Sequence, residues 1–461
     1  MVLIRLMVVL GLLALLPGAE NQRPRAAPGG EPPQGFRGLD VTLPPCSMIL
    51  ARPTATAITL NILCAEEETG CVRYGTQPGT RESATSARTF PKGEPVTVVL
   101  EGLRPDTAYS YRFHGSRSTS DEVVFHTARP PGRSFTCTVI ADSHLDVNTD
   151  PALYQRTLAN ARRDAPDFHL DLGDTFMTEK HPTRESAARQ YLAQRFYLGP
   201  LGASAPLLWI LGNHDGEYPR GRDDGTEDLA LWSNRIRTRH FPNPVPDGFY
   251  SGNATPHPQA GPLQDYYAWA WGDAQFIVLD PFWNTRRQGV SGNWKRTLGT
   301  EQYQWLERTL ATGSPRYRFV FIHHLVGGAD RQARGGSEAA GLYEWGGHET
   351  DGKDTFAVNR PGWALPIHQL LVRHGVATVF HGHDHLYAQQ EADGIIYQAV
   401  PQPGHAGGDE ARSATEYGYR SGIILGTSGH IRLGIGPDQA TVDLVRTDGS
   451  TARHYLIPPH R

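Results

Sequence analysis

Five short polar motifs hold the residues of this chain whose types and spacing could do chemistry. They are Asp142-Ser-His144, Gly173-Asp174, Gly212-Asn-His-Asp215, His323-His324 and Gly382-His-Asp-His385. Each motif lies at, or directly after, the C-terminal end of a predicted apolar strand. Their carboxylate, amide and imidazole groups form a mixed set of oxygen and nitrogen ligands without a thiolate. Such a set suits Mn, Fe, Zn or Co better than an all-oxygen calcium site.

Strands that alternate with helices are needed to position these motifs. We predict strands at Phe135–Ala141, Phe168–Leu172, Leu207–Leu211, Phe276–Leu279, Tyr317–Ile322 and Ala377–Phe380, and helices at Pro151–Ala165, Arg184–Leu198, Thr300–Leu310 and Leu365–His374. Side chains that follow neighbouring strands can converge at the edge where the carboxyl ends of the strands emerge. The end of the chain, from Gly394 to Ile457, shows four or five strands without helices.

Two long inserts interrupt this α/β pattern. They cover roughly residues 216–265 and 325–364, and both are rich in Gly, Pro and Arg. Loops of this length are usually functional or disordered. We expect them to be irregular and to determine which substrate is accepted.

The preceding segment, residues 41–128, has an all-β pattern. Tyr109, Tyr111 and Phe113 alternate with polar residues after a turn, and the run Leu-x-Pro-x-Thr-x-Tyr at 103–109 resembles a fibronectin type III domain. This fold carries many functions. We expect a spacer or a wall of the substrate site here, with carbohydrate binding as the alternative. A Pro-Pro-Gly hinge then leads to the second domain, residues 133–461.

The N-terminus shows a targeting signal. Arg5 precedes the eleven-residue apolar run Leu6–Leu16, which is shorter than the roughly 20 residues that span a bilayer and typical of a secretory signal peptide. We therefore predict a signal peptide at 1–19, a linker at 20–40, and a secreted or periplasmic protein without a membrane segment after cleavage. An uncleaved anchor is the alternative.

The charges favour neither nucleic acid nor an acidic tail. There are 44 basic and 48 acidic residues, giving a net charge of −4, and no basic stripe is present. We expect a small-molecule partner.

The four cysteines permit two disulfides in an exported chain. Cys46, Cys64 and Cys71 lie in the β domain and Cys137 in the second domain. If all four are oxidised, Cys64–Cys71 with Cys46–Cys137 is the natural pairing. The alternative is that Cys137, in a strand, is a buried free thiol.

Taken together, the five motifs resemble the signature of the calcineurin-like metallophosphoesterase superfamily. That signature runs D-x-H, G-D, G-N-H-D/E, H and G-H-x-H, and the resemblance covers about residues 135–435. With its N-terminal β domain, the chain is similar to purple-acid-phosphatase-like members. The resemblance implies a four-layer αββα sandwich preceded by a small fibronectin type III-like sandwich.

The resemblance also implies a ligand set for two divalent ions, Mn, Zn or Fe. Asp142, His144, Asp174 and His385 would hold the first ion, and Asp174, Asn213, His323 and His383 the second. A hydroxide shared by the two ions would attack phosphorus. His323 rather than its neighbour His324 is the expected ligand.

His214 is expected to face the substrate, where it would stabilise the transition state or protonate the leaving oxygen. Asp215 could orient His214. The alternative is that His214 only supports the metal ligands. Tyr387 and His381 are expected to be structural. The arginines of the inserts are expected to be solvated surface residues, with contact to phosphate as the alternative: Arg220, Arg222, Arg331 and Arg334.

The implied activity is that of a phosphomonoesterase. Three alternatives remain. They are a phosphodiesterase acting on nucleotides or lipid head groups, an inactive secreted binding module, and an enzyme that hydrolyses another kind of bond at the same dinuclear site. The complete ligand set argues against the inactive module.

One departure from the purple acid phosphatases bears on the metals. Those enzymes place a tyrosine three residues after the bridging aspartate and a glycine in the D-x-H motif. This chain has Met177 and His144 at those positions. A neutral imidazole stabilises a trivalent ion less than a phenolate does, so we expect divalent metals and a colourless protein.

Overall fold

The computed structural model describes residues 35–79, 83–219, 228–285, 292–326, 334–407 and 411–460. The predicted signal peptide and most of the predicted linker lie outside these residues. The last part of that linker is ordered against the second domain, because the backbone nitrogen of Arg37 donates to the carbonyl of Leu145 (2.8 Å). Within the described residues, no helix has the length and apolar character required to cross a membrane.

The N-terminal region is all-β, as predicted. One sheet contains β1 (Cys46–Ala51), β2 (Ile58–Cys64) and β6 (Val96–Leu100), and the other contains β4 (Ser83–Ala84), β3 (Glu68–Gly75), β7 (Ala108–Gly115) and β8 (Val123–His126), with β5 (Arg88–Phe90) paired to β3. Alternate side chains of both sheets, such as Leu60 and Phe113, form a common core. The hydroxyl of Tyr109 accepts a hydrogen bond from the backbone nitrogen of Arg104 (2.9 Å), a corner that is typical of such sandwiches.

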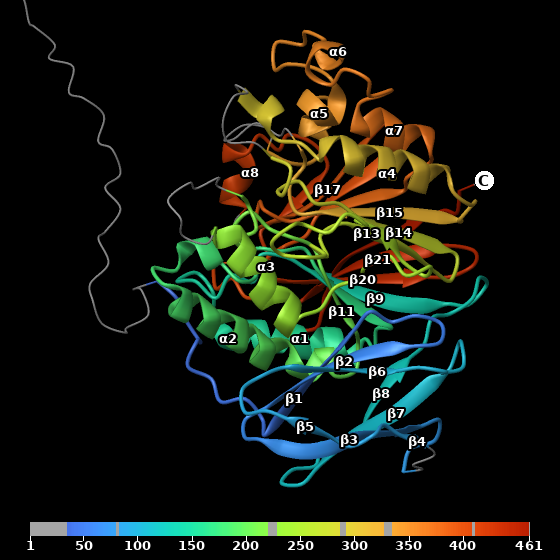
Figure 1. The fold of residues 1–461 in the computed structure, drawn as a ribbon. Coiled ribbons are helices and arrows are strands. Elements are labelled where there is room, and N and C mark those ends of the chain that lie inside the picture. The colour runs from blue at the N-terminus through green and yellow to red at the C-terminus, as the bar shows by residue number, and fades with distance from the viewer. Residues whose placement is uncertain are drawn as a thin grey trace, which may run out of the picture. The chain divides into compact units, whose positions relative to one another are not determined.

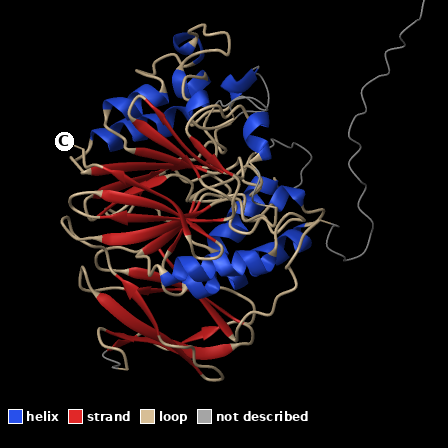
Figure 2. Ribbon diagram, turned by 180° about the vertical axis from the view of Figure 1, so that it is seen from behind, coloured by secondary structure: helices blue, strands red, loops and turns tan. Residues whose placement is uncertain are grey.

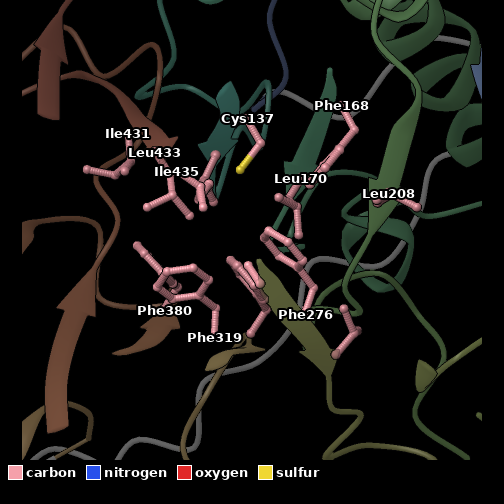
Figure 3. Packing of buried hydrophobic residues seen from close by; sticks show 14 of the residues in the cluster. Cys137, Phe168, Leu170, Leu208, Phe276, Phe319, Phe380, Ile431, Leu433 and Ile435 are labelled. Carbon is pink, nitrogen blue, oxygen red and sulfur yellow. The ribbon is translucent and has the colours of Figure 1, made fainter. Parts of the chain in front are cut away.

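The predicted cysteine pairing is wrong. Cys46 and Cys64 form a disulfide, while Cys71 and Cys137 are free thiols. The reason is strand register, since Cys46 and Cys64 lie directly opposite each other on the antiparallel strands β1 and β2. Cys71 follows on β3 in the other sheet. Cys137 points into the core between the sheets of the second domain, where Figure 3 shows it among aromatic and aliphatic side chains.

Two large sheets form the centre of the second domain (Figures 1 and 2). The first has the order β11 (Leu207–Trp209), β10 (Phe168–Asp171), β9 (Phe135–Ile140), β20 (Gly429–Ile435), β21 (Ala440–Arg446) and β22 (Thr451–Ile457). The second has the order β12 (Ser251–Gly252), β13 (Tyr267–Trp271), β14 (Ala274–Val278), β15 (Tyr317–Ile322), β16 (Thr378–His381), β18 (Ile395–Ala399), β17 (Tyr387–Ala392) and β19 (Ile423–Leu425).

The facing sides of these sheets bury one apolar cluster. Phe168 and Leu433 come from the first sheet, and Phe276 and Phe319 from the second (Figure 3). Because both faces of each sheet are covered, the central strands are almost continuously apolar instead of alternating. All six residues of β15 are buried, for example.

Helices cover the outer faces of both sheets, as Figure 2 shows. They are α1 (Pro151–Arg163) and α2 (Arg184–Gly202) on the first sheet and α4 (Gly299–Ala311) and α7 (Ile367–Arg373) on the second. The structure also describes the helices α3 (Leu229–His240), α5 (Tyr343–Gly346), α6 (Phe356–Asn359) and α8 (Arg412–Glu416). Leu158 of α1 and Tyr191 of α2 pack on the first sheet, and Leu306 of α4 and Leu371 of α7 pack on the second. The predicted αββα sandwich is therefore confirmed.

Most predicted helices and strands are present with ends shifted by a few residues. The inserts differ from the expectation, because 216–265 contains the twelve-residue helix α3 and 325–364 contains α5 and α6. The helix α8 also interrupts the C-terminal strands. The sequence of α3 shows little helical periodicity of apolar residues, because its buried face includes polar residues such as Asn234 and Arg237.

Candidate metal centre

The polar motifs converge because the strands that precede them are parallel. The strands β9, β10 and β11 pair in parallel in the first sheet, as β14, β15 and β16 do in the second. The residues Asp142, Asp174 and Asn213 follow the first set, and His323 and His383 follow β15 and β16. Their side chains meet where the carboxyl ends of the two sheets face each other, at the edge that the sequence predicts.

The backbone at this edge is strained. Five of the predicted ligands have positive φ, namely Asp142 (57°), His144 (43°), Asp174 (54°), His383 (72°) and His385 (59°). Non-glycine residues adopt this region at a cost of about 1–3 kcal/mol, and such residues concentrate at functional sites. The strain turns each side chain out of its strand direction and toward the others.

Glycines allow the loops to approach one another. Gly173 has φ of 94°, a conformation that a side chain would make costly. A Cβ on Gly212 would overlap the backbone nitrogen and the carboxylate of Asp174. The glycines of the G-D and G-N-H-D motifs therefore permit the bridging candidate to reach the centre.

The first group of converging side chains comprises Asp142, His144 and His385, whose nearest ligand atoms lie within 4.8 Å of one another. Oδ1 of Asp142 lies 3.7 Å from Nε2 of His144 and 3.5 Å from Nε2 of His385. Oδ2 of Asp142 accepts a hydrogen bond from the backbone nitrogen of His383 (2.8 Å), which fixes the direction of the carboxylate.

The second group comprises Asp174, His323 and His383. Nε2 of His323 lies 3.3 Å from Oδ2 of Asp174 and 3.2 Å from Oδ1 of Asn213. The same Oδ2 of Asp174 lies 3.8 Å from Nε2 of His144, which belongs to the first group. Asp174 thus faces both groups, as a bridging ligand would.

The donor atoms fit divalent cations. Nε2 of His144 and Oδ1 of Asp142 are buried and make no hydrogen bond, and a buried polar atom without a partner costs about 1–3 kcal/mol. In two of the imidazoles the other ring nitrogen has a partner: Nδ1 of His144 lies 3.2 Å from Oδ2 of Asp146, and Nδ1 of His323 donates to the carbonyl of Leu172 (2.8 Å). Metal-binding histidines are oriented in this way.

The charges of the centre also suit cations. Burial opposes ionisation of Asp142 and Asp174, but the surrounding imidazoles keep the pKa of both carboxyls below the usual value. Burial also opposes the charged form of His323 and lowers its pKa, but Asp174 and Asp142 outweigh this effect and raise the pKa of the imidazole to about 9. Two ionised carboxylates therefore lie at the centre.

His214 lies beside the two groups and is oriented by a residue that the sequence analysis missed. Its Nδ1 lies 2.7 Å from Oε1 of Glu179, in the short 3-10 helix Thr178–Lys180. We expected Asp215 to orient His214, but Asp215 accepts hydrogen bonds from four backbone nitrogens, those of Asp174, Thr175, Phe176 and Gly212. Asp215 therefore holds the loop around the bridging candidate.

Two glutamines of α2 hydrogen-bond to the two loops that follow β9 and β10 and carry the predicted ligands His144 and Asp174. Nε2 of Gln190 donates to the carbonyls of His144 (2.6 Å) and Thr175 (2.8 Å). Nε2 of Gln194 donates to Oγ of Ser143 (3.0 Å) and again to the carbonyl of Thr175. The two residues are four positions apart, so both lie on one face of the helix.

The next residue of α2, Arg195, joins this helix to the β-sandwich. It is completely buried and donates five hydrogen bonds, to Oγ and the carbonyl of Ser47, to Oδ1 and the carbonyl of Asn61, and to the carbonyl of His240. Burial lowers the pKa of Arg195 to about 9. Arg195 therefore attaches the β-sandwich to α2, the helix whose glutamines hydrogen-bond to the loops of the predicted metal ligands.

A cavity of about 290 Å³ opens beside the second group. Asn213, His214 and His383 line it together with Pro281, Phe282, Val326, Arg296, His324 and Arg334. Among the described residues, no residue of the β-sandwich contributes to it, which favours the spacer role of the sandwich over the substrate-wall role. His323 faces the metal ligands, whereas His324 lines the cavity.

The expectation of a solvated surface is wrong for Arg334. Its side chain is 18% exposed, with Nε 3.0 Å from Oδ1 of Asp384, and its guanidinium carbon lies 3.7 Å from the centre of the Tyr417 ring. Arg220, Arg222 and Arg331 lie outside the described residues. The buried positions of His381 and Tyr387 agree with structural roles.

Comparison with known proteins identifies the family. The calcineurin-like phosphoesterase profile matches residues 135–387, which is more than half of the chain and includes all the predicted metal ligands. The chain belongs to the calcineurin-like phosphoesterase family. It is therefore a metal-dependent hydrolase of phosphate esters.

Solved structures show the same fold as this phosphoesterase. PhoD is 15% identical with a TM-score of 0.60, and the match covers 92% of this chain and 90% of PhoD. The purple acid phosphatase PPD1 from yellow lupin (Lupinus luteus) seeds is 15% identical with a TM-score of 0.61, over 89% of this chain and 74% of that enzyme. Both matches extend into the N-terminal β region. Curated protein sequences give no match to the chain.

Proposed function

We propose that this phosphoesterase is an exported phosphomonoesterase that works with two divalent ions. The observation that carries the proposal is the position of Asp174, whose Oδ2 lies 3.8 Å from Nε2 of His144 and 3.3 Å from Nε2 of His323. Asp142, His144, Asp174 and His385 would hold one ion, and Asp174, Asn213, His323 and His383 the other. When bound, such ions acidify water and offset the charge of the phosphate oxygens.

The residues of the chain itself would orient the ester. His214 lines the cavity beside the second group, and Glu179 fixes its ring so that Nε2 turns toward Asp174, 4.0 Å from Oδ2. From this position Nε2 would hold a proton for the leaving oxygen. The arrangement supports His214 as the general acid.

The dimensions of the cavity support a monoester. At about 290 Å³, the cavity is at the lower limit of ligand pockets, which is about 300 Å³. One short organic group would fill it, whereas a diester must place two.

Export is supported by the disulfide between Cys46 and Cys64, because disulfides form mainly in oxidising compartments. The predicted signal peptide at residues 1–19 would direct the chain there. N-terminal sequencing of the mature protein, with determination of the compartment, tests this part of the proposal.

A screen with matched substrates tests the activity. The purified protein would be supplied with Mn, Zn, Fe or Co in turn and assayed with a phosphomonoester, the diester of the same alcohol, and pyrophosphate. We expect about two ions per chain and preferential cleavage of the monoester. Faster cleavage of the diester, or full activity with a single bound ion, would contradict the proposal.

A further inference from the structure

Two arginines line the cavity beside the second ligand group. Arg296 and Arg334 both contribute to its wall, and among the described residues that line it none is a carboxylate. The remaining wall includes the apolar side chains of Pro281, Phe282 and Val326. An organic group with a negative charge is the occupant that matches such a lining.

The arginines are held in place by the protein. The carbonyl of Arg296 accepts a hydrogen bond from the guanidinium of Arg360 (3.0 Å), which also pairs with the buried Glu344. Arg334 donates to the carbonyl of His383 (3.2 Å) and pairs with Asp384. The backbone of Arg296 and the guanidinium of Arg334 are therefore held in place, and an anchored guanidinium loses little conformational entropy when it binds an anion.

Arg296 is separated from the ligand atoms by imidazole rings. Its terminal nitrogen lies 3.2 Å from Nδ1 of His324, and the ring of His324 lies 4.4 Å from that of His383. His324 therefore lies between Arg296 and the predicted ligand His383 in this chain of contacts.

We propose that this cavity selects phosphate esters whose alcohol part carries a second anionic group, a carboxylate or a phosphate, at the end of a short apolar chain. Arg296 binds that group together with Arg334. The apolar wall receives the connecting carbons. This inference rests on the proposed phosphomonoesterase function, because it assigns the alcohol side of the same ester to the cavity.

Binding of phosphonates, which the enzyme does not hydrolyse, tests the inference without catalysis. Calorimetry of the metal-loaded protein would compare propylphosphonate, 3-phosphonopropanoate and propane-1,3-bisphosphonate, which share a three-carbon chain and end in a methyl, a carboxylate or a second phosphonate. A charge-assisted hydrogen bond is worth about 1.5–3 kcal/mol, so at least one charged ligand should bind about tenfold or more tightly than propylphosphonate. Whichever of 3-phosphonopropanoate and propane-1,3-bisphosphonate binds with the higher affinity identifies the preferred anion, carboxylate or phosphate. Equal affinity for all three would overturn the proposal.

The variant Arg296→Met tests the assignment to this residue. It should remove most of the preference for charged ligands, a change of about 10–100-fold in relative affinity. The control Arg308→Met, at an exposed position of α4, should retain the preference. If Arg296→Met weakens the three ligands by the same factor, the residue binds the reacting phosphate or supports the fold, and the proposal fails.

Hydrolysis separates this inference from the proposed function. Cleavage of propyl phosphate tests the phosphomonoesterase, and faster cleavage of the esters that end in carboxylate or phosphate tests the cavity. If the charged phosphonates bind more tightly than propylphosphonate but no monoester is cleaved, the proposed phosphomonoesterase function is contradicted and the inference about the cavity is not. Cleavage of monoesters without any preference would contradict the inference alone.

Discussion

Nδ1 of His214 lies 2.7 Å from Oε1 of Glu179. Such a contact keeps Nδ1 protonated and directs Nε2 toward the cavity, and the proton for the leaving oxygen is the second proton of the imidazolium, on Nε2. The residue that orients the imidazole is therefore separated from it by 35 positions in the sequence.

Glu179→Gln should accordingly lower kcat while both metals stay bound. We expect a loss of about 10–100-fold, smaller than the loss on removing the imidazole. In a His214→Ala background the same change should have almost no further effect, because Glu179 acts through His214. Glu101→Gln, at an exposed position of the β-sandwich, serves as the control. Equal losses in both backgrounds would show that Glu179 has another role.

His214→Ala should leave metal content unchanged and lower kcat by about 10²–10⁴-fold, the usual contribution of a general acid. The loss should be smaller for aryl phosphates, whose leaving groups need less protonation. Kinetics across leaving groups of different pKa would check this expectation. A uniform loss across the series would indicate that His214 stabilises charge on the phosphate instead.

Asp174→Asn should remove most of the activity and at least one metal per chain. The amide keeps the size of the side chain but loses the negative charge that offsets two cations. Metal analysis by mass spectrometry, alongside activity, measures both effects, with the exposed Asp438→Asn as the control. A variant that kept two metals and normal turnover would refute the bridging assignment.

Arg195→Met should destabilise the protein without touching the metal ligands. The change leaves the acceptors on Ser47, Asn61 and His240 without their donor, and each buried acceptor left unpaired costs about 1–3 kcal/mol. A clear decrease in the thermal midpoint is expected relative to Arg189→Met, at an exposed position of the same helix. Equal midpoints would show that this junction contributes little to stability.

The iron-loaded protein should be colourless. Met177, three residues after Asp174, is buried and offers a thioether where purple acid phosphatases offer a phenolate, while His144 lies with Asp142 and His385 in the first group. An imidazole in place of the phenolate favours divalent ions. A visible tyrosinate-to-iron band that disappeared in Tyr387→Phe would contradict this prediction.

The sequence was sufficient to predict the order of strands and helices and the types of residue at the metal centre. Long apolar strands are visible in local patterning, and each motif directly follows one, so parallel pairing brings Asp142 and Asp174 to one edge of the first sheet. Packing of the two sheets then brings His323, which follows a strand of the second sheet, to the same place. The α3 insert was not predicted because its buried face contains polar residues such as Asn234 and Arg237, which reach their common acceptor Glu217 only in the folded protein.

Contacts between distant segments were decided by the tertiary structure. Glu179 and Arg296 are ordinary charged residues in the sequence, and their roles depend on reaching His214 and His324 across loops. The pairing of Cys46 with Cys64 depends on which strands share a sheet and in which register. Local patterning specifies which face of an element is buried, but the partner of a polar or sulfur atom depends on packing between elements far apart in the chain.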